Sequence, residues 1–363
     1  MRITPFIKHL LSQKPNLTDE LVHPRFQSAS REAFRYASLA SGGTICLVTG
    51  PTGSGKTTLL RAIAEFVKTK VFEGIDDDQL PVIGMTAGTS QDGKIRMKYV
   101  LSELLSDLGH PSIDPTKIER TGGYKPVLRR DETSMLSMVR HGLQVNRTRL
   151  IFIDEGQFLT EHRDPNLRGT ILESMKSLVT SSTDLILCGG YQLLVELESI
   201  KAHLASRVIP IVVDRYRESE ADIAAWRKIV SDLSESPKLR LHDPEILVRN
   251  ADQMLEESQG VIGVMERRLL HMALLGPKIT QRSIDATRPS RKKFETLRSE
   301  ILMGEAHLSD IYAAAKGQPK RNERMAEEET PPSEATQKKR KGKAGKPKAF
   351  QRVAKRASPK VNA

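Results

Sequence analysis

The run GPTGSGKTT, residues 50–58, has the residue types and spacing that bind a nucleoside triphosphate. It fits the P-loop pattern G-x-x-x-x-G-K-[ST]. Its glycines allow the backbone to wrap closely around phosphates, so that N–H groups point at the anion. Lys56 supplies positive charge to the β- and γ-phosphates, and the Thr57 hydroxyl is placed to bind Mg²⁺. The expected phosphate-binding residues are Gly50, Pro51, Thr52, Gly53, Ser54, Gly55, Lys56, Thr57 and Thr58.

A second run, LIFIDEGQF, places an Asp-Glu pair directly after apolar residues. The carboxyl end of a parallel strand would bring Asp154 and Glu155 beside the P-loop. Asp154 is expected to hold Mg²⁺ through water. Glu155 is expected to orient and deprotonate the attacking water. The pair therefore indicates hydrolysis of ATP, with Mg²⁺, rather than nucleotide binding alone.

Arg207, in HLASRVIPI, comes just before another apolar run. In oligomeric ATPases, an arginine at this place reaches the γ-phosphate held by the neighbouring subunit and stabilises transition-state charge there. We therefore count Arg207 among the candidate catalytic residues, with Lys56 and Glu155. The alternative is a surface arginine without a catalytic role.

Alternating strands and helices are expected to position these residues. Apolar β-rich runs predict strands at 44–49, 82–86, 149–154, 184–188 and 208–213. Helical spacing of apolar residues predicts helices at 56–68, 98–108, 132–146 and 171–179. Because the strands are nearly all apolar, we expect a parallel sheet covered on both faces. The predicted fold class is α/β, a P-loop domain with a five-stranded parallel sheet.

The remaining chain divides by composition. Residues 1–40 are predicted to form an N-terminal helical extension, and 41–216 the α/β domain. Residues 217–313 read as a small all-helical lid. The predicted helices of this lid lie at 221–233, 244–258, 261–275 and 280–286. Residues 314–363 cannot bury a core, and we expect a disordered basic tail.

The net charge of the chain is +12, which indicates a polyanionic partner. The segment 316–360 holds 15 Lys or Arg and 5 Glu, so the rest of the chain is nearly neutral. A nucleic-acid site in the folded part must therefore be a local patch. The basic tail is either an arm that binds DNA or a partner protein, or a solubilising segment.

Cysteine content and hydropathy indicate the cellular compartment in which the protein resides. Cys46 and Cys188 lie in apolar runs, and two cysteines do not make a disulfide framework. The N-terminal run lacks the apolar core of a signal peptide. No apolar run approaches the ~18 residues of a membrane span. We therefore expect a cytoplasmic protein without membrane contact.

The order of these motifs resembles the AAA+ ATPases, and among them the TnsC/TniB/MuB group of DNA-transposition regulators, TnsC above all. The likeness lies in ILCGGYQLL and HLASRVIPIVVDRYR. They are similar to that group's Gly-x-Tyr-x-Leu run, its Leu-x-Ser-Arg and its strand ending in Arg-Tyr. The stretch GVIGVMERRLLHMAL is similar to the Gly-x-Ile-Gly helix of TniB-type lids. The resemblance covers about residues 20–290.

This resemblance implies an AAA+ fold and an ATP-bound homo-oligomer, a ring or a helical filament, on double-stranded DNA. Such proteins link a target-selection protein to the transposase subunits, and ATP hydrolysis disassembles them. By the same resemblance, DNA contacts come from loops after the second strand. Basic side chains there would bind phosphates without reading sequence, unless they are ordinary solvated charge. The candidate DNA-binding residues are Lys94, Arg96, Lys98, Lys117, Arg120, Thr121 and Lys125.

Two positions depart from the usual AAA+ pattern. After strand four, such proteins usually have an Asn or Thr that senses the γ-phosphate, whereas the Cys-Gly-Gly run at 188–190 offers no such side chain. Tyr191 and Gln192 are the candidate substitutes. The second sensor is an arginine of the lid helix, for which Arg267 and Arg268 are the nearest candidates. Both departures suggest slow, regulated hydrolysis.

Two other functions fit the same ATP site. An AAA+ replication initiator or helicase loader shares the site and the lid, but an initiator usually adds a winged-helix or similar DNA reader, and we find none after the lid. A nucleotide-gated scaffold would use ATP only to switch assembly. Glu155 argues against a pure scaffold, while the missing sensor side chains favour weak catalysis. An ABC-type ATPase is disfavoured because no LSGGQ-like run lies between the P-loop and Asp154.

Overall fold

Five parallel strands form a single sheet in the order β2-β3-β4-β1-β5. We describe a computed structural model of the chain, which covers residues 4–12, 24–39, 42–67, 79–88, 97–110, 131–160, 165–199, 208–236, 238–243 and 245–315. The strands are β1 (Ile45–Thr49), β2 (Val82–Thr86), β3 (Leu150–Asp154), β4 (Asp184–Gly189) and β5 (Val208–Val212). The predicted α/β P-loop fold with a five-stranded parallel sheet is confirmed.

The register of the sheet places the ends of its central strands side by side. Every residue of β1, β3 and β4 is buried, as continuous apolar strands of a parallel sheet require. Thr49 at the end of β1 pairs with Gly189 of β4. Ile153 of β3 pairs with Leu187 of β4. The segments that follow β1, β3 and β4 therefore leave the sheet at one edge.

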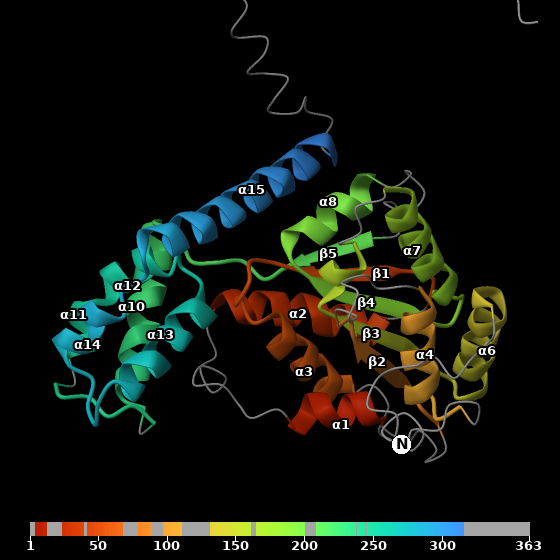
Figure 1. Ribbon diagram of the computed structural model, residues 1–363, viewed down its shortest axis with the longest axis horizontal. Coiled ribbons are helices and arrows are strands. Elements are labelled where there is room, and N and C mark those ends of the chain that lie inside the picture. The colour runs from red at the N-terminus through yellow and green to blue at the C-terminus, as the bar shows by residue number, and fades with distance from the viewer. Residues whose placement is uncertain are drawn as a thin grey trace, which may run out of the picture. The chain divides into compact units, whose positions relative to one another are not determined.

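Helices cover both faces of the sheet (Figure 1). Alternate strand residues face the two layers, because successive side chains of a strand point to opposite faces. One layer consists of α1 (Pro5–Ser12), α2 (Pro24–Leu39) and α3 (Lys56–Phe66). The other consists of α4 (Met97–Asp107), α6 (Glu132–Val145), α7 (Pro165–Leu178) and α8 (Tyr191–Ser199). A short 3-10 helix, η2 (Gly156–Leu159), follows β3.

The helices after β5 enclose an apolar core of their own around the fully buried Trp226, whose indole N–H donates to the Ala251 carbonyl at 2.9 Å. We call this part the lid. It consists of α10 (Glu220–Ser234), α11 (Ile246–Arg249), α12 (Ala251–Glu257), α13 (Ile262–Leu274) and α14 (Gln281–Ala286). No helix among the described residues is long and apolar enough to cross a membrane.

Four helices differ from the sequence prediction. The helix expected at 171–179 begins six residues earlier, at Pro165. The helix expected at 244–258 is two helices, α11 and α12, with a break at Asn250. The Asn250 side chain donates to the Ile246 carbonyl at 2.7 Å and so competes with helical backbone bonding. The other two, α8 and the 25-residue helix α15 (Arg291–Ala315), lie where we predicted no helix.

Candidate functional site

The P-loop connects β1 to α3 and has the backbone shape of a phosphate cradle. Gly53 and Gly55 have φ angles of 90° and 96°, which a residue with a side chain rarely adopts. α3 begins at Lys56, so its first N–H groups face the loop. The buried Ser54 hydroxyl has no hydrogen-bond partner among the described residues. A bound phosphate would supply an acceptor for that hydroxyl, which fits the predicted nucleotide site.

Lys56 lies folded onto its own loop. Its ammonium donates to the carbonyls of Gly50 at 3.1 Å and Pro51 at 2.8 Å. Burial lowers the pKa of Lys56, while the neighbouring acidic groups, Cys188, Glu155 and Asp154 among them, act to raise it. These two loop carbonyls are weak partners compared with a phosphate. The lysine is therefore placed to exchange them for the phosphates of a nucleotide.

Thr57 and Asp154 meet where the P-loop faces the end of β3. The Thr57 hydroxyl donates to Asp154 Oδ2 at 2.9 Å. The other carboxylate oxygen, Asp154 Oδ1, accepts from the backbone N–H of Glu155 at 2.8 Å. These are the two side chains that the sequence predicted around Mg²⁺. Hard oxygen donors at one point fit that ion, which usually binds through few protein ligands, substrate phosphates and water.

A cavity of about 820 Å³ lies over these residues, within the range of small-molecule sites. Its lining joins the P-loop and the end of β3 to the turn after β4, to α13 of the lid and to α15. Phe26 of α2 also lines it, with ring atoms 3.8 Å from where a Cβ on Gly55 would lie. A flat apolar side chain beside the phosphate loop suits a nucleotide base. Sequence reasoning gave Phe26 no role.

The ends of β3 and β4 carry different groups. β3 is followed by Glu155 and by Gln157, whose amide N–H donates closely to a Glu155 carboxylate oxygen. Beyond β4, Gly190 donates its backbone N–H to Gln157 Oε1 at 3.3 Å. The two candidate sensors behave differently: the Tyr191 hydroxyl is buried and unpartnered among the described residues, and the Gln192 side chain is exposed in the cavity lining.

The lid contacts the P-loop through backbone atoms. The N–H of Gly263, in the first turn of α13, donates to the Gly53 carbonyl at 2.9 Å. A Cβ on Gly263 would lie 2.5 Å from that carbonyl oxygen, so only glycine fits. One helical turn later, Arg267 lines the cavity, with Nη2 3.1 Å from where a Cβ on Gly53 would lie. Arg267 is therefore the lid cation beside the phosphate loop.

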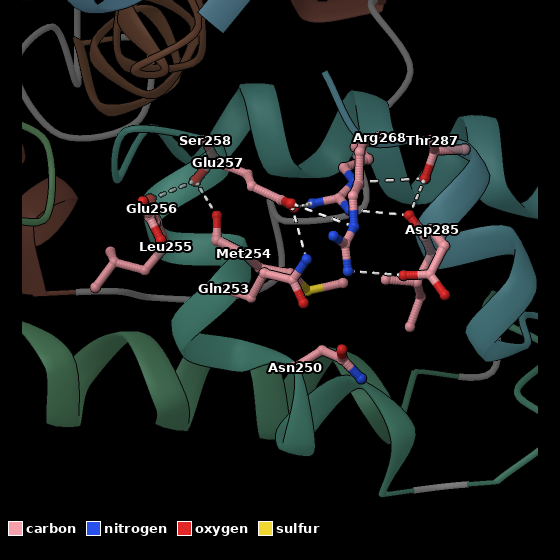
Figure 2. A network of polar contacts seen from close by, with 12 residues as sticks. Asn250, Gln253, Met254, Leu255, Glu256, Glu257, Ser258, Arg268, Asp285 and Thr287 are labelled. Carbon is pink, nitrogen blue, oxygen red and sulfur yellow. Dashed lines mark hydrogen bonds and ion pairs between the residues drawn. The ribbon is translucent and has the colours of Figure 1, made fainter. Parts of the chain in front are cut away.

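Arg268, the other candidate sensor arginine, lies inside the lid instead (Figure 2). It forms a close ion pair with Glu257, and it donates to the Ile284 carbonyl at 3.0 Å and to the Thr287 hydroxyl at 3.4 Å. Gln253 donates to the second Glu257 oxygen at 2.8 Å. This network ties α12, α13 and α14 together. The structure thus separates two neighbouring arginines that the sequence left equivalent.

Helix α15 reaches the cavity from beyond the lid, and sequence reasoning missed it. Glu300 accepts a hydrogen bond from the Thr52 hydroxyl of the P-loop at 3.1 Å. Gly304 packs directly against the ring of Tyr191, because a Cβ on Gly304 would lie only 2.1 Å from a ring atom. Glu305 pairs with Arg215 at 2.7 Å. The helix carries few buried apolar residues, so its apolar periodicity gives a weak signal.

Several predicted site residues lie outside the described residues: Arg207, Lys94, Arg96, Lys117, Arg120, Thr121, Lys125 and the basic tail from Lys316 onward. Lys98 is described. It lies half-buried in the first turn of α4. The roles of all these residues remain predictions.

Comparison with known proteins identifies the core of the chain. Residues 39–195 match a family model described as an AAA domain, and this match spans the P-loop, β3 and β4. Because the match covers fewer than half of the 363 residues, it shows the AAA fold of this part of the chain. The AAA fold implies nucleotide binding, in agreement with the site geometry. No curated protein sequence matches the chain significantly.

Solved structures with a similar arrangement are distant in sequence. The ORC2 protein of Aeropyrum pernix is 14% identical, over 77% of this chain and 71% of that one, with a TM-score of 0.49. A Walker-type ATPase of Pyrococcus abyssi is 17% identical over 84% and 81% of the two chains, with a TM-score of 0.45. Domain III of the replication initiation protein DnaA of Thermotoga maritima is 16% identical over 83% and 99%, with a TM-score of 0.40.

Proposed function

We propose that the chain hydrolyses ATP, assembles as a homo-oligomer on double-stranded DNA and regulates DNA transposition. The hydrolysis part rests on one observation above all. The P-loop hydroxyl of Thr57 meets Asp154 at 2.9 Å, and Glu155 follows directly in the lining of the same cavity. Binding groups and a candidate base thus face one space.

The residues divide the chemistry among them. The N–H groups of the P-loop and the Lys56 ammonium bind the phosphates. Thr57 and Asp154 would hold Mg²⁺, which supplies charge neutralisation at the phosphates when bound. The Glu155 carboxylate accepts a proton from the water that attacks the γ-phosphorus. The bond to the bridging oxygen breaks, and ADP and inorganic phosphate result.

The charge around the cavity supports a site that a second subunit completes. Among the described lining residues, the permanent cations are Lys56 and Arg267. Phosphoryl transfer in such ATPases gains much of its rate from a further arginine that faces the γ-phosphate. Arg207 of a neighbouring copy is our candidate for that role. ATP would then hold two subunits together until it is hydrolysed.

The transposition part rests on the resemblance in sequence. The similar runs include Tyr191, which begins α8 at the cavity, and Arg215 and Tyr216, which connect β5 to the lid. Arg215 pairs with Glu305, while Tyr216 donates its backbone N–H to the Gly260 carbonyl at 3.0 Å. The similar residues therefore lie between the nucleotide site and the lid, where an ATP-dependent change of assembly would originate.

Electron microscopy of the full chain with a duplex and a non-hydrolysable ATP analogue tests the assembly. We expect rings or filaments around duplexes of unrelated sequence. They should be absent with ADP and with Lys56→Ala. Monomers that ignore DNA would contradict the proposal. Assembly on one particular sequence only would favour the alternative, a replication initiator.

Two variants test the proposed DNA contacts. Charge reversal at Lys94 and Arg96 should abolish ATP-dependent DNA binding in a gel-shift assay, because phosphate contacts supply most nonspecific affinity. Unchanged binding at moderate salt would exclude this patch. A chain that ends at Ala315 tests the tail in the same assay and in transposase recruitment. If both survive, the tail is not part of either contact.

A further inference from the structure

The chain turns back sharply after β3, which brings η2 against the end of β4. Glu155 has a φ of 54°, in the left-handed region that residues with side chains seldom adopt. The next residue, Gly156, is pressed onto β4, where a Cβ would lie 2.7 Å from Leu187 and 3.0 Å from the Cys188 carbonyl. Strained backbone of this kind persists where the surroundings require it. The turn sets Gln157 between the ends of the two strands.

The Gln157 amide bridges the candidate base and the turn after β4. Its N–H donates closely to a Glu155 carboxylate oxygen, and its Oε1 accepts from the N–H of Gly190 at 3.3 Å. The same side chain lines the cavity. One amide thus contacts the proposed base, the strand end that lacks a sensor, and the space over the P-loop.

Gln157 also fills the space that a sensor on β4 would need. A Cβ on Gly189 would lie 3.0 Å from Gln157 Oε1 and 3.1 Å from its backbone nitrogen. Gly190, in contrast, has nothing within 4 Å of a Cβ position. The Tyr191 ring is packed against Gly304 of α15. The polar group at the end of β4 is therefore supplied by η2, the short helix after β3.

We propose that Gln157 takes the place of the missing sensor, as a positioning residue that couples the terminal phosphate to Glu155. This inference rests on the proposed ATP hydrolysis. Without a terminal phosphate, the amide holds the Glu155 carboxylate. A γ-phosphate in the cavity offers a charged acceptor, and charge-assisted hydrogen bonds are the stronger ones. The amide then donates to the phosphate and leaves Glu155 to the attacking water, so that ATP and ADP are distinguished.

The test compares full-length wild type with Gln157→Met, which has a similar length and no hydrogen-bonding amide. Steady-state turnover gives kcat and KM, and fluorescent ATP and ADP analogues give the two dissociation constants. We expect kcat to fall about 10- to 100-fold, the effect of losing a hydrogen bond to a charged group. ADP affinity should stay within about 2-fold, because the proposed contact of Gln157 with the nucleotide is to the terminal phosphate alone, which ADP lacks. The preference for ATP over ADP should therefore be lost. Gln144→Met, on the exposed end of α6, is the matched control.

A rescue experiment separates sensing from packing. Gln157→Ala combined with Gly190→Asn places an amide directly after β4, where Gly190 has room for a side chain. We expect this pair to recover part of the kcat and of the ATP preference that Gln157→Ala loses. Gln157→Glu, which keeps the volume but replaces the amide with a carboxylate, should lose both. If Gln157→Met proves unstable on heating, Gln157→Glu replaces it as the variant that tests the sensing role.

The outcomes distinguish failure of the sensing role of Gln157 from failure of the proposed ATP hydrolysis. If wild type binds ATP and never hydrolyses it, with or without duplex DNA, the proposed function fails. If wild type hydrolyses ATP, while Gln157→Met and Gln157→Glu retain its kcat and its preference for ATP, the sensing role of Gln157 is overturned. A larger loss of ATP preference in Gln192→Met than in Gln157→Met would also overturn it.

Discussion

The neighbouring ends of β3 and β4 divide the work of the site unequally. β3 ends in Asp154 and is followed by Glu155 and Gln157, all with polar side chains in the cavity lining. β4 ends in Gly189 and is followed by Gly190, which contribute backbone alone. Both strands are buried and parallel, so either could have carried the polar groups. The difference teaches that a polar group can be supplied to a strand end from the strand beside it.

Removal of the base should have the largest effect on the β3 side. Glu155→Gln keeps the size of the side chain but cannot accept the proton of the attacking water. We expect kcat to fall by about 10²–10⁴, the usual contribution of a general base. Binding of ATP should change little, since Lys56 and the P-loop remain. Phosphate release checks the rate and a fluorescent analogue checks binding. Turnover near the wild-type rate would remove Glu155 from the chemistry.

The two glycines of the β4 side should respond differently to one added methyl group. Gly189→Ala would bring a Cβ 2.7 Å from Leu193 and 3.0 Å from Gln157 Oε1. Overpacking of this kind costs about 1–3 kcal/mol, and displacement of the amide should lower kcat about 10-fold. Gly190→Ala meets nothing within 4 Å and is the control. Steady-state turnover and thermal unfolding check both. Equal losses of kcat and of thermal stability in the two variants would contradict the predicted difference between Gly189 and Gly190.

The lid arginines allow a similar contrast on the opposite side of the cavity. Arg267→Ala should weaken ATP binding about 10-fold, because a charged donor beside the phosphate loop is lost. It should leave thermal stability nearly unchanged, since Arg267 is exposed. Arg268→Ala should instead lower the free energy of unfolding by about 3 kcal/mol, because it leaves the half-buried Glu257 without its main partner. Calorimetry and nucleotide titration separate the two. If Arg268→Ala weakened ATP binding and Arg267→Ala lowered the stability instead, Arg268 would be the nucleotide contact.

The smallest expected effect comes from α15. Glu300 places an exposed carboxylate on Thr52 of the P-loop. Glu300→Gln should strengthen ATP binding about 2- to 5-fold at low salt, because it removes a charge that repels the phosphates. The gain should shrink at high salt, as screening of exposed charges predicts. Glu295→Gln, on the same helix but paired with Arg291, is the matched control. Equal affinity at all salt concentrations would contradict the repulsion.

Local patterns allowed most of the core to be predicted. The P-loop, the Asp-Glu pair and the five strands are each contained in a few consecutive residues, so spacing and apolar runs identify them. The start of α7 was missed because it is set by Pro165, a residue type common at the first helical position, rather than by the apolar period. The break at Asn250 was missed because a side chain that competes for backbone bonding causes it.

The rest of the site depends on contacts between distant segments. Gln157 is an ordinary polar residue in the sequence, and its place follows from the turn at Glu155 and the absence of a side chain at Gly189. Arg267 and Arg268 differ only in their direction around α13. The contact of Glu300 with Thr52 joins residues 248 positions apart. No pattern along the chain distinguishes such cases before the elements are packed.

The most direct test is an experimental structure of the full chain with Mg²⁺ and a non-hydrolysable ATP analogue. We predict the analogue in the P-loop cavity, with the Gln157 amide turned from Glu155 to the terminal phosphate and Glu155 facing a water beside it. A Gln157 amide still bound to Glu155, while a side chain of α8 contacts the terminal phosphate, would contradict this account.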